Sequence, residues 1–330
     1  MITGTLGLSR FKKKHVKPGM VGLTIAEREL SLAYMLPGEN GRPVLQHVES
    51  VRLESADQAA PVLAEMVQEY GLRGVSTTAV LESGTYNLMH VERPKVQEAE
   101  MRDAVKWRIK DLISYPVEEA VVDIYTLPGL EDQVRAANWI YAVVARAASI
   151  QLLVDIVHGS GLNLQAIDIP EFCLRNLVSR DANAGQSTAS LHIMPEQSLL
   201  VLTRSDVMFM TRTYDIGFGD VIRIDESGGD VGLSLGGLLP SHEQSLLEVQ
   251  RSLDYFDSHF GQAQVTRLLV LPDDTLLEPF IEMLRSNTGL NVEPFSFDSV
   301  IDVADSIDVR TLGPAAQAIG ASLRMPEGLS

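Results

Sequence analysis

The sequence predicts an α/β protein with two similar halves and a separate segment inserted into the first half. Three observations support this prediction. The order strand, strand, strand, helix, strand occurs twice along the chain, and residues 86–161 interrupt that order. Hydrophobic residues make up 45% and charged residues 22% of the chain, which is the balance of a globular protein. Its 330 residues are enough for two domains of ordinary size.

The first half opens with three short apolar runs separated by turn residues, which we expect to form an antiparallel meander. A helix should follow, because apolar residues recur at helical spacing and Gly71 stands where helices commonly end. A further apolar run predicts the fourth strand. The expected elements are strands at 20–26, 30–36 and 44–53, a helix at 57–70 and a strand at 74–81.

The inserted segment has elements of its own. We expect a strand from 86 that ends before Pro94, a helix at 96–113, strands at 121–127 and 137–145 around a polar loop at 128–135, and a helix that ends near Gly159. One face of the first helix carries Met101, Ala104, Val105, Ile109 and Leu112. Trp107 lies off this apolar face.

The second half repeats the order of the first after a strand at 164–169, a helix at 170–178 and a short polar linker. Its expected elements are strands at 188–194, 199–202 and 207–214, a helix over about 246–260, a strand at 267–271 and two more helices within 275–323. We therefore divide the chain into four parts: a basic flexible tail at 1–18, a first subdomain at 19–85 and 162–186, an inserted subdomain at 86–161, and a second half at 187–330. A last helix at 314–323 should pack back on the first half.

The charge is strongly acidic except at the start of the chain. The formal net charge is −17, from 27 Lys and Arg against 44 Asp and Glu. Such a body repels polyphosphate, so we do not expect nucleic-acid binding. The first residues contain Lys12, Lys13, Lys14 and Lys17 and no acid, which predicts peripheral contact with an anionic membrane surface. The alternative is a solvated terminus. The single Cys173 and the lack of a visible signal peptide favour a soluble cytoplasmic chain.

Motifs of hydrolysis, metal binding and nucleotide binding are weak or absent. Residues 232–236 match the G-x-S-x-G pattern of a nucleophile elbow, but no apolar strand leads into them, so a surface loop is the better interpretation. The seven histidines form no i, i+4 pair, and no metal site is expected. No Walker sequence and no complete G-x-G-x-x-G occurs.

Several segments together carry a family resemblance. Residues 98–107 are followed by Leu112-Ile-Ser-Tyr-Pro116-Val-Glu-Glu, and further matches lie at 167–171, 210–217, 250–255 and 313–324. The chain resembles the PilM class of type IV pilus assembly proteins, and in particular its MshI subgroup from mannose-sensitive haemagglutinin (MSHA) pilus biogenesis. The resemblance implies an actin-like (FtsA-like) ATPase fold with an inserted 1C subdomain, which agrees with the duplication and the insertion described above.

The resemblance also locates three nucleotide-binding loops, each of which is altered in this chain. The matching positions are Thr24 and Ala26 in the first loop, His192 and Met194 in the second, and Pro272, Asp273 and Asp274 in the third. In the family these positions hold aspartates that bind Mg²⁺ and glycines that let backbone N–H groups approach phosphate. Their loss predicts a pseudo-ATPase without a bound cofactor. The alternative is a working ATPase that binds ATP–Mg²⁺ through other residues.

Partners follow from the same resemblance. PilM-class proteins sit under the inner membrane and bind the cytoplasmic N-terminus of a PilN-type bitopic protein, which corresponds to an MshJ-type protein in the MSHA system. We expect a non-catalytic cytoplasmic scaffold, peripheral to the inner membrane, that also contacts the assembly ATPase or platform and forms a ring. A GspL-like type II secretion scaffold is the alternative.

The peptide groove implied by the resemblance would include Arg102, Trp107, Tyr115, Pro116 and Val117. Trp107 would be the anchor, because a large aromatic side chain is not needed by the apolar face of its own helix. The alternative is that Trp107 packs against strands of its own subdomain.

Overall fold

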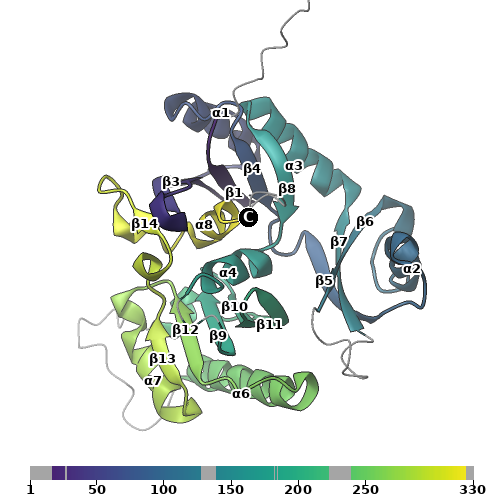
Figure 1. Cartoon of the computed structure of the whole chain (residues 1–330), viewed down its shortest axis with the longest axis vertical. Helices are drawn as coiled ribbons and strands as arrows, with labels where there is room; N and C mark the ends of the chain where they lie inside the picture. The colour runs from purple at the N-terminus through teal and green to yellow at the C-terminus, as the bar shows by residue number, and fades with distance from the viewer. Residues whose placement is uncertain are drawn as a thin grey trace, which may run out of the picture.

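The structure of the chain is a computed structural model that describes residues 17–26, 28–127, 139–181, 183, 185–222 and 239–324. These residues form three β-sheets and the helices that cover them (Figure 1). Within these ranges, every helix is too short or too polar to cross a membrane.

The first sheet has the strand order β14-β3-β2-β1-β4-β8. The predicted meander is confirmed: β1 (Met20–Ala26), β2 (Glu29–Leu36) and β3 (Val44–Arg52) pair antiparallel in sequence. The strands β4 (Ser76–Val80) and β8 (Asn163–Asp168) continue the sheet in parallel. Helix α1 (Ala59–Glu69) buries Leu63, Met66 and Val67 in the core beneath this sheet, as its apolar face predicts.

The second sheet has the order β11-β10-β9-β12-β13. It consists of β9 (Thr188–Ile193), β10 (Ser198–Arg204), β11 (Val207–Tyr214), β12 (Arg267–Leu271) and β13 (Asn291–Pro294). Helices α6 (Pro240–Phe260) and α7 (Glu278–Thr288) cover its outer face, and the short α5 (Phe218–Val221) precedes α6. The strand β11 is therefore an edge of this sheet.

The two halves repeat one pairing pattern, which confirms the predicted duplication. In each half, two antiparallel pairs of strands build the meander. The first strand of the meander also pairs in parallel with the strand that follows the helix: β1 pairs with β4, and β9 pairs with β12. The sequence did not predict β13 or the two-residue β14 (Asp302–Val303), which pairs with β3. Strands this short carry too few residues to show an alternating pattern.

The inserted segment forms a third sheet with the order β5-β7-β6, in which β5 (Tyr86–Glu92), β6 (Ala120–Thr126) and β7 (Trp139–Arg146) pair antiparallel. Its helix α2 (Met101–Arg108) is shorter than the predicted 96–113. As a result Leu112, expected on the buried face, lies beyond the helix and is 64% exposed. The predicted loop 128–135 and the motif at 232–236 lie outside the described residues.

Helix α3 (Ala147–Ser160) follows β7, and its place in the sequence assigns it to the inserted segment. Its buried side chains Leu153 and Val157 instead share a core with Leu63 and Met66 of α1. This helix is thus part of the layer that covers the first sheet.

Two helices fill the space between the first and second sheets (Figure 1). Helix α8 (Ala316–Ser322) packs on β1, β2 and β4, and α4 (Pro170–Val178) packs between α8 and the strands β9, β10 and β11. Helix α8 and strand β1 approach so closely that a Cβ atom on Gly22 would lie 1.8 Å from the carbonyl oxygen of Ala318. Because α8 comes late in the chain, both halves contribute to the packing of the first sheet.

Candidate functional site

The first predicted nucleotide loop is a tight connection between β1 and β2. Thr24 and Ala26 lie at the end of β1, paired with Ser31 and Glu29 of β2. The buried Ser31 hydroxyl lies 2.7 Å from the Ser50 hydroxyl on β3. The polar side chain on this part of the hairpin is therefore bound within the sheet.

The second loop, between β9 and β10, is closed by one hydrogen bond of its own and by contact with residues 217–220. The backbone N–H of Met194 donates to the carbonyl of Gln197 at 2.9 Å, and the Met194 carbonyl accepts from the N–H of Phe218 at 2.8 Å. Pro195 has no N–H. The N–H of Gly217 donates to the Asp220 carboxylate at 2.8 Å. These four positions therefore offer no free backbone donor to a phosphate group.

His192 lies just before this loop, at the position where the resemblance implies an aspartate. It is 5% exposed, and burial lowers its pKa from 6.5 to about 4. The imidazole is therefore neutral at pH 7.

The third loop is held against another segment. A Cβ atom on Gly313 would lie 2.6 Å from Cβ of Pro272. The carboxylate of Asp274 accepts from the N–H of Leu276 at 2.9 Å and so caps the short 3₁₀ helix Thr275–Leu277. This leaves Asp273 as the member of the pair without such a capping role.

Two buried acids near these loops are also bound within the protein. The Asp168 carboxylate pairs with the Arg324 guanidinium at 3.0 Å, and Glu171 accepts a hydrogen bond of 2.6 Å from the Tyr86 hydroxyl. Within the described part of the chain, no three His, Cys, Asp or Glu side chains are grouped so that they could hold a metal ion.

The residues predicted to bind a partner lie on the inserted subdomain. Arg102 pairs with Asp123 at 2.9 Å on the surface. Tyr115 is half-buried, with the Arg146 guanidinium 4.5 Å from the centre of its ring. Pro116 is exposed and Val117 half-buried at the start of the 3₁₀ helix Val117–Glu119. Trp107 is 62% exposed, so the alternative in which it packs into its own subdomain is wrong.

Of the basic residues predicted to touch a membrane surface, Lys12, Lys13 and Lys14 lie outside the described residues. Lys17 is described, and its ammonium group donates a hydrogen bond to the carbonyl of Gly71, next to the end of α1.

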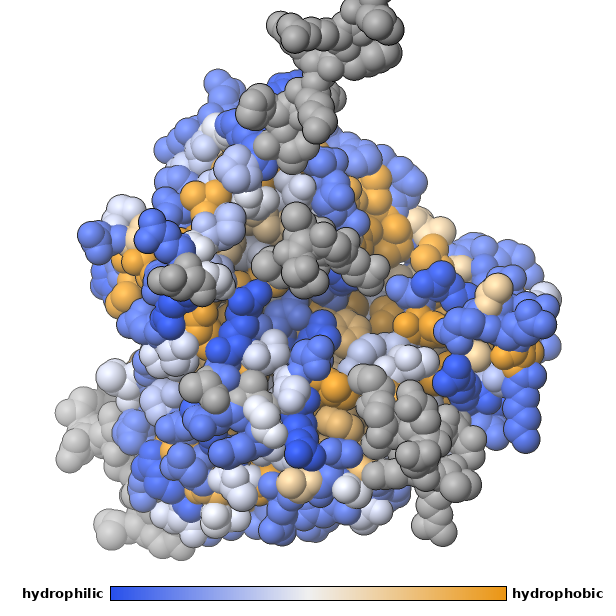
Figure 2. Space-filling view, in the orientation of Figure 1, coloured by the Kyte–Doolittle hydropathy of each residue, from blue (hydrophilic) through white to orange (hydrophobic). Residues whose placement is uncertain are grey.

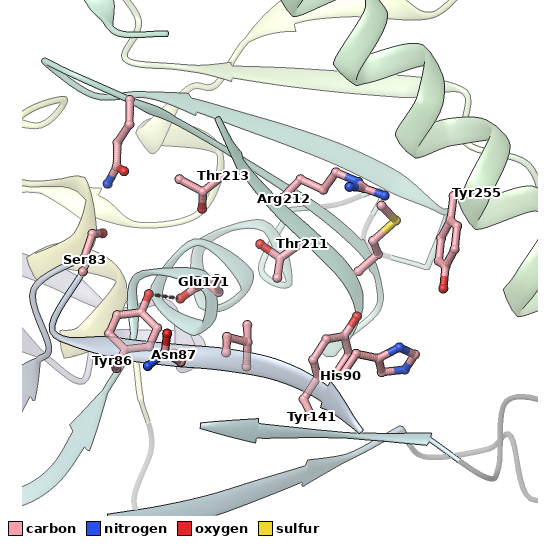
Figure 3. Close-up of a pocket in the computed structure, with 14 residues that line it drawn as sticks. Ser83, Tyr86, Asn87, His90, Tyr141, Glu171, Thr211, Arg212, Thr213 and Tyr255 are labelled. Carbon is pink, nitrogen blue, oxygen red and sulfur yellow. Dashed lines mark hydrogen bonds between the residues drawn. The ribbon is translucent and has the colours of Figure 1, made fainter. Parts of the chain in front are cut away.

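A cavity of about 490 Å³ lies between the inserted sheet and the second sheet (Figure 3). The surface is hollowed in this part of the molecule, with apolar side chains in the hollow (Figure 2). The strand β5 forms one wall and β11 the opposite wall. The lining includes Tyr86, Asn87, Leu88 and His90 of β5, Met210, Thr211, Arg212 and Thr213 of β11, Tyr141 of β7, Glu171 of α4, Gln197, and Tyr255 of α6.

The polar groups of this cavity differ in how they are bound. Burial raises the pKa of Glu171, which accepts from Tyr86. His90 stacks between Trp139 and Tyr141 at 4.9 and 5.0 Å, and burial, with His259 nearby, lowers its pKa. In contrast, the buried hydroxyl oxygen of Thr211 has no hydrogen-bond partner within the described chain.

Two tyrosines join the walls next to the cavity. The Tyr141 hydroxyl donates to the carbonyl of Phe209 at 3.0 Å, and the N–H of Met208 donates to the Tyr125 hydroxyl at 3.0 Å. Sequence reasoning missed the cavity, because β5 and β11 are far apart in the chain. The available signal was the polar run Thr211-Arg212-Thr213 at the end of an otherwise apolar strand.

The two repeated halves, the helices between the sheets and the inserted sheet define an actin-like ATPase fold, which confirms the fold predicted from the sequence. Comparison with solved structures supports this assignment. The chain is similar to the structure described as the PilM–PilN type IV pilus biogenesis complex, with a TM-score of 0.71, 22% identity, and coverage of 92% of this chain and 98% of that one. It is also similar to a Bacteroides thetaiotaomicron protein described as having an actin-like ATPase fold and unknown function, with a TM-score of 0.50, 11% identity, and coverage of 93% and 99%. No protein family model matches the chain, and no curated protein matches it.

Proposed function

We propose that this protein is a non-catalytic scaffold of a type IV pilus assembly machine of the MSHA type. In this proposal it lies in the cytoplasm under the inner membrane and binds the cytoplasmic N-terminus of a PilN-like (MshJ-like) membrane protein. The observation that carries the proposal is the closed turn between β9 and β10, where the backbone groups of Met194 and of the adjoining Gly217 and Phe218 are bound within the protein.

The closed turn bears on catalysis because phosphate binding in loops depends on backbone N–H groups that point at the ligand. Here the N–H groups of Met194, Gly217 and Phe218 are bound internally, and a buried neutral His192 stands where the resemblance implies a Mg²⁺-binding carboxylate. The negative charge of the nearby Asp273 side chain would also repel a triphosphate. A pseudo-ATPase fits these features better than a working one.

The partner assignment rests on the fold and on one exposed side chain. The similar solved structure is described as a complex of PilM with PilN. Trp107 exposes 62% of its surface on α2, where it is free to fill a pocket formed with a bound peptide. Contacts with the assembly ATPase or platform, a ring of copies and a membrane contact through Lys12, Lys13, Lys14 and Lys17 are part of the same proposal.

The test is a melting experiment with ATP and Mg²⁺. A ligand at 100 times its dissociation constant would stabilise the fold by about 2.7 kcal/mol. We expect no Mg²⁺-dependent rise in melting temperature at millimolar ATP, with Mg²⁺ alone as the control. A clear rise would refute the pseudo-ATPase.

A second measurement tests the partner. Trp107→Ala should weaken binding of a PilN-like N-terminal peptide by about 2 kcal/mol while leaving the melting temperature nearly unchanged. Leu152→Ala is the matched control, since Leu152 is 63% exposed on α3. Equal peptide binding by the Trp107 variant and the wild type would show that Trp107 on α2 is not part of the peptide-binding site.

A further inference from the structure

The cavity between β5 and β11 lies between two strands that are sheet edges in the described part of the chain. The strand β5 is an edge of the inserted sheet and β11 an edge of the second sheet, and residues of both strands line the cavity on opposite sides. An edge strand presents a row of N–H and C=O groups without partners in the sheet. An extended chain can add to such an edge through main-chain hydrogen bonds.

Part of the β11 edge is already occupied. Met208 and Phe209 bond to the hydroxyls of Tyr125 and Tyr141. The cavity begins where these contacts stop, along residues 210–213. The tyrosines therefore fix the separation of the two walls. Among the described residues, no further contact occupies the outer edge of β11 along 210–213.

One polar group in this open stretch has no partner. The Thr211 hydroxyl oxygen is buried without a hydrogen bond in the described chain, and Figure 3 shows Thr211 across the cavity from Tyr86 and Asn87. A buried hydroxyl without a hydrogen-bond partner lowers stability. A bound chain that offered a donor or acceptor here would remove that cost.

The ionisable side chains of the lining differ in how far they are already bound within the protein. Glu171 is bound to Tyr86 and burial disfavours its charge; burial likewise favours neutral His90. Arg212 is exposed, lies 6.0 Å from the centre of the Tyr255 ring, and has no ion pair within the described chain. A carboxylate is the side chain that pairs best with such a guanidinium, through charge-assisted hydrogen bonds.

We propose that this cavity binds an extended peptide segment, which pairs with the open edge of β11 and places one acidic side chain against Arg212. This inference shares with the proposed function only the kind of ligand, which is a peptide. It names a different surface from α2 and a different recognition chemistry.

The experiment is selection of a random peptide library, displayed on phage, against the full-length protein. We expect enriched sequences that share one acidic position. Synthetic peptides of these sequences should bind Arg212→Gln at least about tenfold more weakly than wild type. The Arg212→Glu variant should prefer the matched peptide in which lysine replaces the acidic residue. Arg251→Gln is the control, since Arg251 is an exposed arginine on α6 outside the cavity.

The strand pairing is tested on the same peptides by methylation of alternate backbone amides, which should weaken binding at one set of positions and not at the other. The inference is overturned if nothing is enriched, if the enriched sequences lack an acidic position, or if the Arg212 variants bind like the wild type. Because the library contains no pilus protein, failure here leaves the pilus proposal standing, and ATP binding would leave this inference standing.

Discussion

The turn at residues 194–197 and the cavity between β5 and β11 adjoin each other but differ in whether their polar groups have partners within the described chain. At the turn, the backbone groups of Met194 and of the adjoining Gly217 and Phe218 are bound within the protein. In the cavity, the Thr211 hydroxyl lacks a partner in the described chain and Arg212 lacks an ion pair there. Gln197 belongs to both regions, since its carbonyl closes the turn and its residue lines the cavity. The difference teaches that the availability of polar groups, more than their number, marks a candidate binding site.

The largest effect we expect concerns His192, beside the closed turn. Burial lowers its pKa from 6.5 to about 4, so between these values the folded protein binds fewer protons than the unfolded chain. Stability contributed by neutral His192 is present above pH 6.5 and is lost as the pH falls toward 4, by about 3 kcal/mol. Denaturant unfolding as a function of pH should show a flatter profile for His192→Leu than for the wild type. The exposed His158→Gln serves as control. Parallel profiles for His192→Leu and wild type would contradict the closed, dry environment of this ring.

A smaller loss of stability should follow from crowding the same turn. A Cβ atom on Gly217 would lie 2.1 Å from the Pro195 carbonyl oxygen, so Gly217→Ala must push the turn apart and should cost about 1–3 kcal/mol. Gly219→Ala is a close control two residues away, because nothing lies within 4 Å of its Cβ position. Thermal melting of the two variants checks this. Equal melting temperatures would mean that the turn is loose enough to admit a ligand.

The smallest effect, of opposite sign, is expected in the cavity. Thr211→Val replaces an unpaired hydroxyl by a methyl group and should leave stability unchanged or raise it by up to about 1 kcal/mol. Thr77→Val is the matched control, since the buried Thr77 hydroxyl donates to the Val75 carbonyl at 3.1 Å and its loss should destabilise. Chemical denaturation measures both. If Thr211→Val destabilised as much as Thr77→Val, the Thr211 hydroxyl would have a partner after all, and the contrast between the two regions would weaken.

Most of the fold could be predicted from the sequence, because its long strands and helices show their own periods. The meander of the first half and the apolar face of α1 are local patterns, and the repeat follows from their order. The errors lie where distant contacts decide the outcome. Helix α2 ends at Arg108 although apolar residues continue to Leu112, and α3 joins α1 although it follows the inserted strands directly.

The candidate sites were less predictable than the fold. Altered loop residues such as Met194 could be found from the family resemblance, but the closure of their turn depends on Phe218, more than twenty residues later. The cavity needs Asn87 of β5 opposite Thr211 of β11, and no local pattern joins residues so far apart. The position of Trp107 off the apolar face of α2 is a local property, but the sequence left open whether it packs in its own subdomain, and the structure exposes it.

The packing of α8 on β1 has a consequence for how the chain folds as it is made. The first strands leave the ribosome early, but the helix that covers them and the strand β14 that extends their sheet are encoded almost three hundred residues later. Because synthesis proceeds at roughly 5–20 residues per second, tens of seconds pass before α8 can cover the side of β1 and β2 that faces it. Native burial of that face of the first sheet is thus complete only after the second half has been translated.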